Sequence, residues 1–319
     1  MEKNRSEYPD LIADIGGTNA RFALVDTNRQ FYADRILACA DFSDLTAATK
    51  AYLTEVAVPR PRQAAMAVAT PVIGDQIQFT NNDWSFSTET IRRELGLDRL
   101  LILNDFTALA LALPLLNPDE RRAIGGGMAT AEAPIGLLGA GTGLGVSGLV
   151  WSGSRWTPLQ TEGGHVTFSA SDEQEWAISR VLHRRFGHVS SERLLSGPGL
   201  MNLYTALAEL EGWPVDQLNP ADISDLGLAG GCEHCRAVLN LFCGALGAVA
   251  GNLALTLGAR GGVYIGGGIV PRLGEFFDRS AFRARFEAKG RFSKYLATIP
   301  TWVITAENPA LRGVAAALE

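Results

Sequence analysis

The sequence predicts an α/β protein built from two related domains. At 319 residues the chain exceeds the length at which a single hydrophobic core stops growing. Strand and helix patterns alternate along its first third, which is typical of an α/β layer. A strand, a Gly/Thr turn and a second strand occur at residues 11–26 and again at residues 135–150. This repeated strand–turn–strand unit indicates two domains that face one ligand.

Composition and charge exclude several classes of protein. Hydrophobic residues make up 47% of the chain and charged residues 19%, so a core can form and disorder is not expected. The net charge is −6 and no run of Lys or Arg exceeds two residues, so the sequence shows no basic cluster that would bind nucleic acid or an anionic membrane. The N-terminus lacks a signal-peptide core, and Gly or Pro interrupts the apolar stretches before they reach spanning length. We therefore expect a soluble, cytoplasmic protein.

The expected elements follow from hydrophobic periodicity and from capping and turn residues. Segment 117–133 is rich in Pro, Gly and charge and is expected to join the domains. Ser171 and Gln174 are spaced as a capping box, and the last helix is expected to pack on the first domain. Strands are expected at residues 11–15, 20–25, 36–39, 64–68, 100–103, 135–138, 145–150, 262–265 and 302–305, and helices at residues 45–56, 87–95, 106–113, 172–186, 199–210, 222–229, 232–257, 272–277, 282–289 and 309–318.

The first Gly/Thr turn is a candidate phosphate site. Gly16 and Gly17 allow unusual φ angles and carry no Cβ, so backbone N–H groups can converge on phosphate oxygens. Thr18 and Asn19 add side-chain donors, and Asp14 at the strand end would hold Mg²⁺ through water. Gly-Gly also joins ordinary β-hairpins, and the pattern alone leaves that alternative open.

Two polar residues follow the buried strand at residues 100–103. Asn104 and Asp105 stand at its carboxyl end, where a helix begins and where open α/β sheets bind ligands. Asp105 would accept the proton of an attacking hydroxyl while Asn104 holds a neighbouring hydroxyl. An Asp here is also a good helix N-cap, and both roles can coexist.

Glycines gather at three strand ends, residues 16–17, 139–145 and 266–268, which indicates a nucleotide held by backbone from several sides. Gly-Lys never occurs, so the chain has no P-loop motif. No cluster completes G-x-G-x-x-G, because Leu144, Val146 and Pro271 occupy the sixth positions. This disfavours a Rossmann dinucleotide site.

The loop TEGGH carries candidate sugar contacts. Glu162 and His165 are three residues apart, and one such pair is too small for a structural zinc site. Their acceptors and donor suit the vicinal hydroxyls of a sugar. Glu192 is a third candidate polyol contact or simply an acid at a helix start.

Four cysteines in so long a chain do not make a disulfide framework and suit a reducing compartment. Cys232-x-x-Cys235, with His234 between them and Cys243 beyond, is half of a common zinc pattern. No second pair follows, so we expect buried thiols on a helix rather than zinc.

Six segments, in this order and at these spacings, closely resemble the bacterial-type glucokinases, which have the two-domain actin/hexokinase-like (ribonuclease H-like) fold. The segments are LIADIGGTNARFAL, LILNDFTALALALP, GAGTGLGVSGLV, EGGHVTF, ERLLSGPGLMNLY and GGVYIGGGIVPRL. The resemblance covers nearly the whole chain. It implies phosphorylation of the glucose 6-hydroxyl by ATP with Mg²⁺, in a cleft between a small and a larger α/β domain.

Carried over by position, the resemblance gives each candidate residue a role. Asp105 becomes the catalytic base, and Asp14 the candidate Mg²⁺ residue. The sugar ligands become Asn104, Asp105, Gly143, Glu162, His165 and Glu192. The ATP ligands become Asp14, Ile15, Gly16, Gly17, Thr18 and Asn19 in a first phosphate loop, Gly141 and Thr142 with Gly143 in a second, and Gly266, Gly267 and Gly268 near adenosine.

The resemblance also suggests a homodimer, a small domain of residues 1–115 plus 306–319, and a large domain of residues 116–305. Two rival functions remain: a kinase for mannose or an N-acetylated sugar, and a sugar-sensing regulator without turnover. Cys232 and Cys235 do not fit the zinc motif of the related repressor/open-reading-frame/kinase family, and the chain shows no N-terminal helix-turn-helix segment. Both features favour an enzyme over a regulator.

Overall fold

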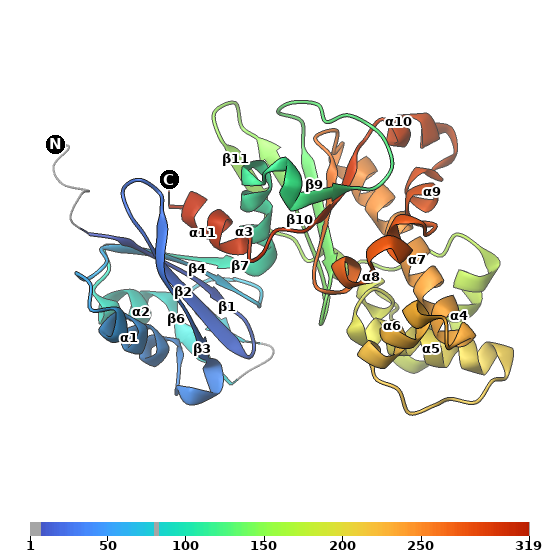
Figure 1. The fold of residues 1–319 in the computed structure, drawn as a ribbon, viewed down its shortest axis with the longest axis horizontal. Coiled ribbons are helices and arrows are strands. Elements are labelled where there is room, and N and C mark those ends of the chain that lie inside the picture. The colour runs from blue at the N-terminus through green and yellow to red at the C-terminus, as the bar shows by residue number, and fades with distance from the viewer. Residues whose placement is uncertain (1–7, 80–82, 319) are drawn as a thin grey trace. The chain divides into compact units, whose positions relative to one another are not determined.

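The computed structural model describes residues 8–79 and 83–318 of the chain. Contacts divide the chain into two compact units, Met1–Leu116 with Ala306–Glu319, and Asn117–Thr305. These boundaries lie beside the 115/116 and 305/306 boundaries expected from the sequence. Each unit has its own sheet with helices packed on it (Figure 1).

A five-stranded mixed sheet forms the centre of the first unit. Its strands are β1 (Asp10–Ile15), β2 (Asn19–Val25), β3 (Phe31–Ala38), β4 (Gln63–Val68) and β7 (Arg99–Asn104), in the order β3-β2-β1-β4-β7. β1 runs antiparallel to β2 and parallel to β4, which runs parallel to β7. The register pairs Ile15 with Val68 and Val68 with Asn104, so the three parallel strands end level with one another.

Helices cover this sheet, and their ends follow from local sequence. α1 (Leu45–Val56) begins where the Asp44 carboxylate accepts the Ala47 N–H at 2.8 Å, and α2 (Thr88–Leu95) ends at Gly96, whose φ is 60°. The last helix packs on α3 (Asp105–Ala112). The remaining elements of the unit are η1 (Cys39–Asp41), β5 (Gln76–Gln78), β6 (Ser85–Ser87), η2 (Leu113–Leu115) and α11 (Ala310–Ala316).

A six-stranded sheet forms the centre of the second unit. Its strands are β8 (Arg121–Ala123), β9 (Ile135–Ala140), β10 (Leu144–Trp151), β11 (Trp156–Leu159), β12 (Val263–Gly266) and β13 (Thr301–Ile304), in the order β11-β10-β9-β12-β13-β8. The expectation that residues 117–133 only join the domains is wrong for β8, which pairs antiparallel with β13. Its polar sequence suits an edge strand, which has one sheet neighbour.

The second unit is otherwise helical. Its helices and 3₁₀ turns are η3 (Pro118–Glu120), η4 (Gly163–His165), α4 (Glu173–Phe186), η5 (Ser191–Arg193), α5 (Gly197–Glu211), α6 (Pro220–Ala229), α7 (Glu233–Leu257), α8 (Ile269–Asp278), α9 (Phe282–Glu287), η6 (Gly290–Phe292) and α10 (Ser293–Ala297). The expected Ser171/Gln174 capping box is wrong: Asp172 caps α4 by accepting the Glu175 N–H at 2.9 Å. Asp provides the stronger negative charge at a helix N-terminus.

The long helix α7 corrects another expectation. Its glycines do not interrupt it, and its 25 residues are long and apolar enough to cross a membrane by length and composition alone. However, 67% of its apolar window is buried inside the second unit, as in a core helix. Gly247 and Gly251 serve packing, because a Cβ there would lie 2.1 Å from the Phe282 oxygen and 2.5 Å from the Phe286 oxygen of α9.

Candidate active site

The carboxyl edge of the first sheet brings Asp14 and Asp105 near each other. Asp14 is the penultimate residue of β1, and Asp105 follows β7 directly. Burial and, to a smaller extent, repulsion from Asp105 raise the pKa of Asp14 against the opposing effect of Arg21, and the net result is a pKa of about 6. The two carboxylates therefore lie at the same edge of the sheet, close enough for the charge of Asp105 to affect Asp14.

Asn104 and Asp105 have different roles at the start of α3. The N-cap is Asn104, whose Oδ1 accepts the N–H groups of Phe106 at 2.9 Å and Thr107 at 3.2 Å. The alternative that Asp105 is the N-cap is therefore wrong, and Asp105 is the first helical residue. Its Oδ1 accepts the Asn104 Nδ2–H and the Phe106 N–H, both at 2.9 Å. Two donors thus orient the carboxylate.

The first glycine turn differs from the expectation in detail. Neither Gly16 nor Gly17 has a positive φ, so their conformational freedom is not used. The Gly16 N–H donates to the Asn19 oxygen at 2.9 Å and is already engaged within the turn. Thr18 and Asn19 are exposed, and the Cys39 N–H donates to the Thr18 oxygen at 2.8 Å. The exposed part of the turn is therefore its second half.

In the second unit, Glu192 lies against the other Gly/Thr turn. The Leu144 N–H donates to Glu192 Oε2 at 2.9 Å, and a Cβ on Gly143 would lie 2.5 Å from the same oxygen. Thr142 is exposed at the tip, and the Gly141 oxygen accepts the Gly197 N–H at 2.8 Å. The candidate phosphate turn and one candidate sugar acid therefore form one structure.

The TEGGH loop lies beside that structure. His165 Nδ1 is 3.9 Å from Glu192 Oε1. Gly164 lies so close to β10 that a Cβ would be 2.0 Å from the Leu144 oxygen, and Glu162 is the exposed residue before η4. Close glycine packing therefore places the loop, and its two polar side chains face solvent.

The third glycine cluster packs on the second. Gly266 pairs with Gly139 across β12 and β9, and a Cβ on Gly139 would lie 2.5 Å from the Gly266 carbonyl carbon. Gly267 has a φ of 80°, and a Cβ there would lie 2.2 Å from the Ala140 oxygen. Gly268 is the N-cap of α8, and no atom lies within 4 Å of a Cβ added to it. The structure thus gathers Gly141, Thr142, Gly143, Glu162, His165, Glu192 and Gly266–Gly268 in the second unit.

Sequence reasoning missed Arg21. The β1–β2 register pairs it directly with Asp14, and Asp34 Oδ1 and Oδ2 hold its guanidinium at 3.0 and 2.8 Å. The signal was available, because in a hairpin that turns at residues 16–19 Asp14 and Arg21 are cross-strand partners. Arg21 supplies the positive charge that opposes the raised pKa of Asp14.

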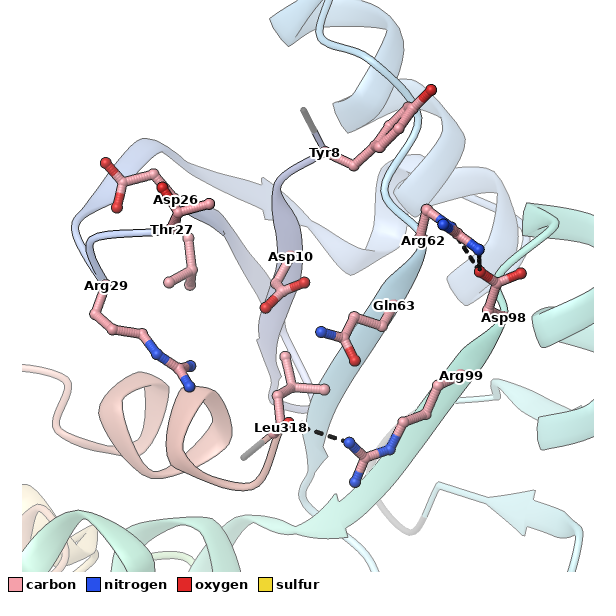
Figure 2. Close-up of a pocket in the computed structure, with 11 residues that line it drawn as sticks. Tyr8, Asp10, Asp26, Thr27, Arg29, Arg62, Gln63, Asp98, Arg99 and Leu318 are labelled. Carbon is pink, nitrogen blue, oxygen red and sulfur yellow. Dashed lines mark hydrogen bonds and ion pairs between the residues drawn. The ribbon is translucent and has the colours of Figure 1, made fainter. Parts of the chain in front are cut away.

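A pocket of about 330 Å³ in the first unit does not belong to this site (Figure 2). It lies at the opposite edge of the sheet, where Asp10, Gln63 and Arg99 begin β1, β4 and β7. Its cations already have partners: Arg62 pairs with Asp98, and Arg99 donates to the Leu318 oxygen at 3.1 Å.

The donor chemistry at the carboxyl edge suits Mg²⁺. Among residues 8–79 and 83–318, no three His, Cys, Asp or Glu side chains form a metal-binding group. Mg²⁺ commonly uses only one or two carboxylates together with water and substrate phosphates. Asp14 provides such a hard oxygen donor, and a divalent cation would offset both the burial and the repulsion from Asp105 that raise its pKa.

Comparisons with known proteins identify the family. The sequence model of the glucokinase family matches residues 11–319. A glucokinase of Aromatoleum aromaticum is 57% identical over 98% of this chain and 95% of its own. The crystal structure of a glucokinase from an Antarctic psychrotroph superposes with a TM-score of 0.88, at 40% identity over 97% of this chain and 98% of that one.

A more distant structure shares the fold. The glucokinase of Balamuthia mandrillaris, solved in complex with glucose, is 19% identical over 98% of this chain and 94% of its own, with a TM-score of 0.81. The expected actin/hexokinase-like α/β fold is thereby confirmed. With the family matched along nearly its whole length, this chain belongs to the glucokinase family.

Proposed function

We propose that this chain transfers the γ-phosphoryl group of ATP to the 6-hydroxyl of D-glucose, with Asp105 as the general base. The observation that carries the proposal is the carboxylate of Asp105, oriented by Asn104 and the Phe106 N–H at the carboxyl edge of a sheet. A base in this role must accept a proton as the hydroxyl attacks. Asn104 is proposed to hold a neighbouring sugar hydroxyl.

The proposed sugar contacts in the second unit are Glu162, His165, Glu192 and Gly143. Glu192 is fixed by the Leu144 N–H, which prepares one acid to accept hydrogen bonds from hydroxyls. Polar groups that would lose their partners with a wrong epimer discriminate strongly between sugars. The Balamuthia glucokinase in complex with glucose supports this choice of sugar.

The proposed ATP contacts are the two Gly/Thr turns and the glycines that begin α8. Residues Ile15–Asn19 and Gly141–Gly143 would surround the phosphate oxygens, with the Thr18 and Thr142 hydroxyls and the N–H groups not engaged within the turns as donors. Gly266–Gly268 would lie near adenosine, with open space at Gly268. Asp14 would hold Mg²⁺ through water, and the ion would neutralise charge on the phosphates. Glucose and ATP are thus the proposed small-molecule partners.

We further propose that the protein works in the cytoplasm as a homodimer, without nucleic-acid or membrane partners. A free-thiol chain with net charge −6 supports the location. The family resemblance supports the dimer. Light scattering coupled to size exclusion tests the dimer, and a single species at 34.1 kDa would contradict it.

A substrate panel tests the proposed function. ADP release from Mg-ATP is measured with glucose, mannose, fructose, galactose and N-acetylglucosamine in parallel. We expect turnover with glucose and a kcat/KM at least about 10-fold lower for each other sugar, because polar groups of the site would lose hydrogen-bond partners. Preferred turnover of mannose or N-acetylglucosamine would contradict the assignment of glucose. Heat protection by glucose without ADP release from any sugar would instead indicate a regulator.

A further inference from the structure

We propose that Cys232 and Cys235 form a reversible dithiol–disulfide couple, in which Cys232 attacks a small disulfide and Cys235 completes the intrachain bond. Neither residue has a role in the proposed phosphoryl transfer. The inference therefore stands or falls independently of that function.

The first turn of α7 holds the two sulfurs close together. Cys232 is the N-cap of the helix, and the Cys235 N–H donates to Cys232 Sγ at 3.2 Å. Residues three apart on a helix have Cα atoms about 5 Å apart, which is inside the range of disulfides. The bond can form while the helix stays in place.

The exposure of the two thiols fits two different roles. Cys232 is half-buried and accessible, whereas Cys235 is 0% exposed. An N–H donor at a helix N-terminus stabilises a thiolate, which is the attacking form of a cysteine. Burial, followed by the neighbouring Cys232, raises the pKa of Cys235 to about 12, so Cys235 stays a neutral thiol until a disulfide forms beside it.

The surroundings hold this turn rigidly. The Trp213 ring stacks on His234 with 3.6 Å between the ring centroids. On the other side, a Cβ on Gly227 of α6 would lie 3.0 Å from the Cys235 oxygen. The pair is thus preorganised, while Cys39 and Cys243 are each buried in the core without such an arrangement.

The proposed reaction is ordinary thiol–disulfide exchange. The Cys232 thiolate attacks one sulfur of glutathione disulfide, the glutathione S–S bond breaks, and one glutathione thiolate leaves. The Cys235 thiol then gives up its proton and attacks the Cys232 sulfur, which releases the second glutathione. The protein loses two hydrogens and two electrons, and glutathione disulfide is reduced to two glutathiones. Excess glutathione reverses both steps.

Mass spectrometry of the folded, full-length protein tests the proposal. The protein is equilibrated in glutathione buffers, quenched in acid, alkylated in denaturant and cleaved with trypsin. Cys232 and Cys235 fall in one tryptic peptide, residues 194–236, and Cys39 and Cys243 fall in others. In oxidising buffer we expect this peptide to lose two hydrogens and take up no alkyl group. In reducing buffer we expect it to take up two.

Single serine variants separate the roles. Cys235→Ser is expected to accumulate a glutathione adduct at Cys232, whereas Cys232→Ser is expected to form none at Cys235. Cys243→Ser, a buried thiol of the same helix, is the matched control and is expected to keep the intrachain disulfide. Full alkylation of the wild-type peptide in every buffer would overturn the proposal. Equal adducts in both single variants would overturn the assigned order of attack.

Discussion

Asp14 and Asp105 show how the surroundings of a residue decide what its carboxylate can do. Asp105 is held by the Asn104 amide and the Phe106 N–H, which fix its direction. Asp14 is half-buried beside that charge and is stabilised only in part by Arg21, so its pKa is raised to about 6. The first arrangement suits a proton acceptor, and the second suits a group that a cation completes.

The raised pKa of Asp14 predicts a change in stability with pH. The folded state keeps the proton up to about pH 6, while the unfolded chain loses it near the ordinary aspartate pKa of 3.8. Stability therefore falls as pH rises from about 4 to 6, and the loss is complete above 6. Asp14→Asn removes this penalty and is expected to be more stable than wild type at pH 7 by at most about 3 kcal/mol.

Urea unfolding without nucleotide at pH 4, 5, 6 and 7 measures this difference. We expect the variant's advantage to be near zero at pH 4 and to grow until about pH 6. An advantage that does not depend on pH would contradict the origin assigned to it.

The sequence predicted Asn104 and Asp105 as a pair, but it could not decide which of them caps α3. Both residue types are good N-caps. The choice depends on β7, which continues to Asn104, one residue beyond its apolar run, because Asn104 pairs with Val68 of β4. That pairing is a tertiary contact and leaves no local signal.

At the scale of elements, strongly periodic segments were predicted well. α1 has the expected bounds, residues 45–56, and the parallel strands of the first sheet lie within one residue of expectation. Short strands were missed, namely β5, β6, β8 and β11. Three or four residues give too little periodicity to detect, and the partner strand decides the pairing.

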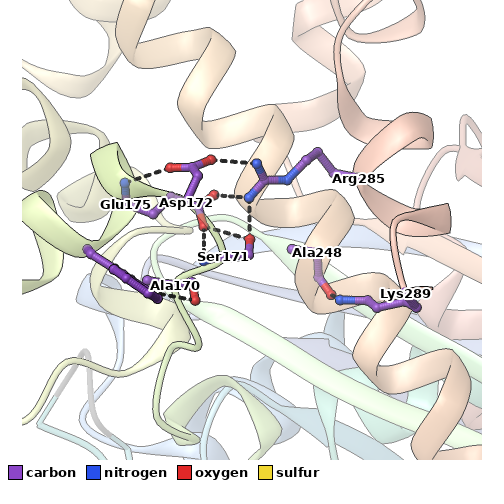
Figure 3. A network of polar contacts seen from close by, with 8 residues as sticks. Ala170, Ser171, Asp172, Glu175, Ala248, Arg285 and Lys289 are labelled. Atoms are coloured by element: carbon purple, nitrogen blue, oxygen red, sulfur yellow. Dashed lines mark hydrogen bonds and ion pairs between the residues drawn. The ribbon is translucent and has the colours of Figure 1, made fainter. Parts of the chain in front are cut away.

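An ion cluster around the buried Glu175 joins α9 to the start of α4 (Figure 3). Glu175 is 3% exposed and accepts the Ser171 N–H at 2.8 Å, while Arg285 contacts Glu175, Ser171 and Asp172. Arg285→Met is expected to cost about 3 kcal/mol of unfolding free energy, because the buried Glu175 would lose its cationic partner.

Urea unfolding of the variant measures this cost, with Arg279→Met as the matched control. Arg279 also pairs with a glutamate, Glu275, but these side chains are 81% and 80% exposed. Exposed pairs contribute little, so the control is expected to lose less than about 1 kcal/mol. Equal losses in the two variants would contradict the role of burial.

At the scale of the whole molecule, the chain returns to the first unit at Ala306 after building the second. α11 then covers the apolar face of the first sheet, where Leu311, Val314 and Leu318 pack with Ile12. The sequence analysis expected the last helix to pack on the first domain. The contact itself depends on Gly313, whose close approach to α3 no sequence pattern reveals.

Gly313→Ala tests that contact. An added Cβ would lie 1.7 Å from the Ala108 oxygen of α3, so α11 must move. We expect a loss of about 1–3 kcal/mol, measured by thermal unfolding, and slower turnover because α3 begins at Asp105. Gly126→Ala is the matched control, since nothing lies within 4 Å of its added Cβ. An unchanged unfolding temperature in Gly313→Ala would contradict the close contact.

The central claim is that Asp105 is the base of a glucose kinase. The most direct test is glucose-dependent ADP release by Asp105→Asn, with glucose binding followed separately by thermal shift. Asp44→Asn is the matched control, because Asn caps a helix as well as Asp does. We expect turnover of Asp105→Asn to fall by at least about 100-fold, with folding and glucose binding retained and the control unchanged. Near-normal turnover in Asp105→Asn would contradict the claim.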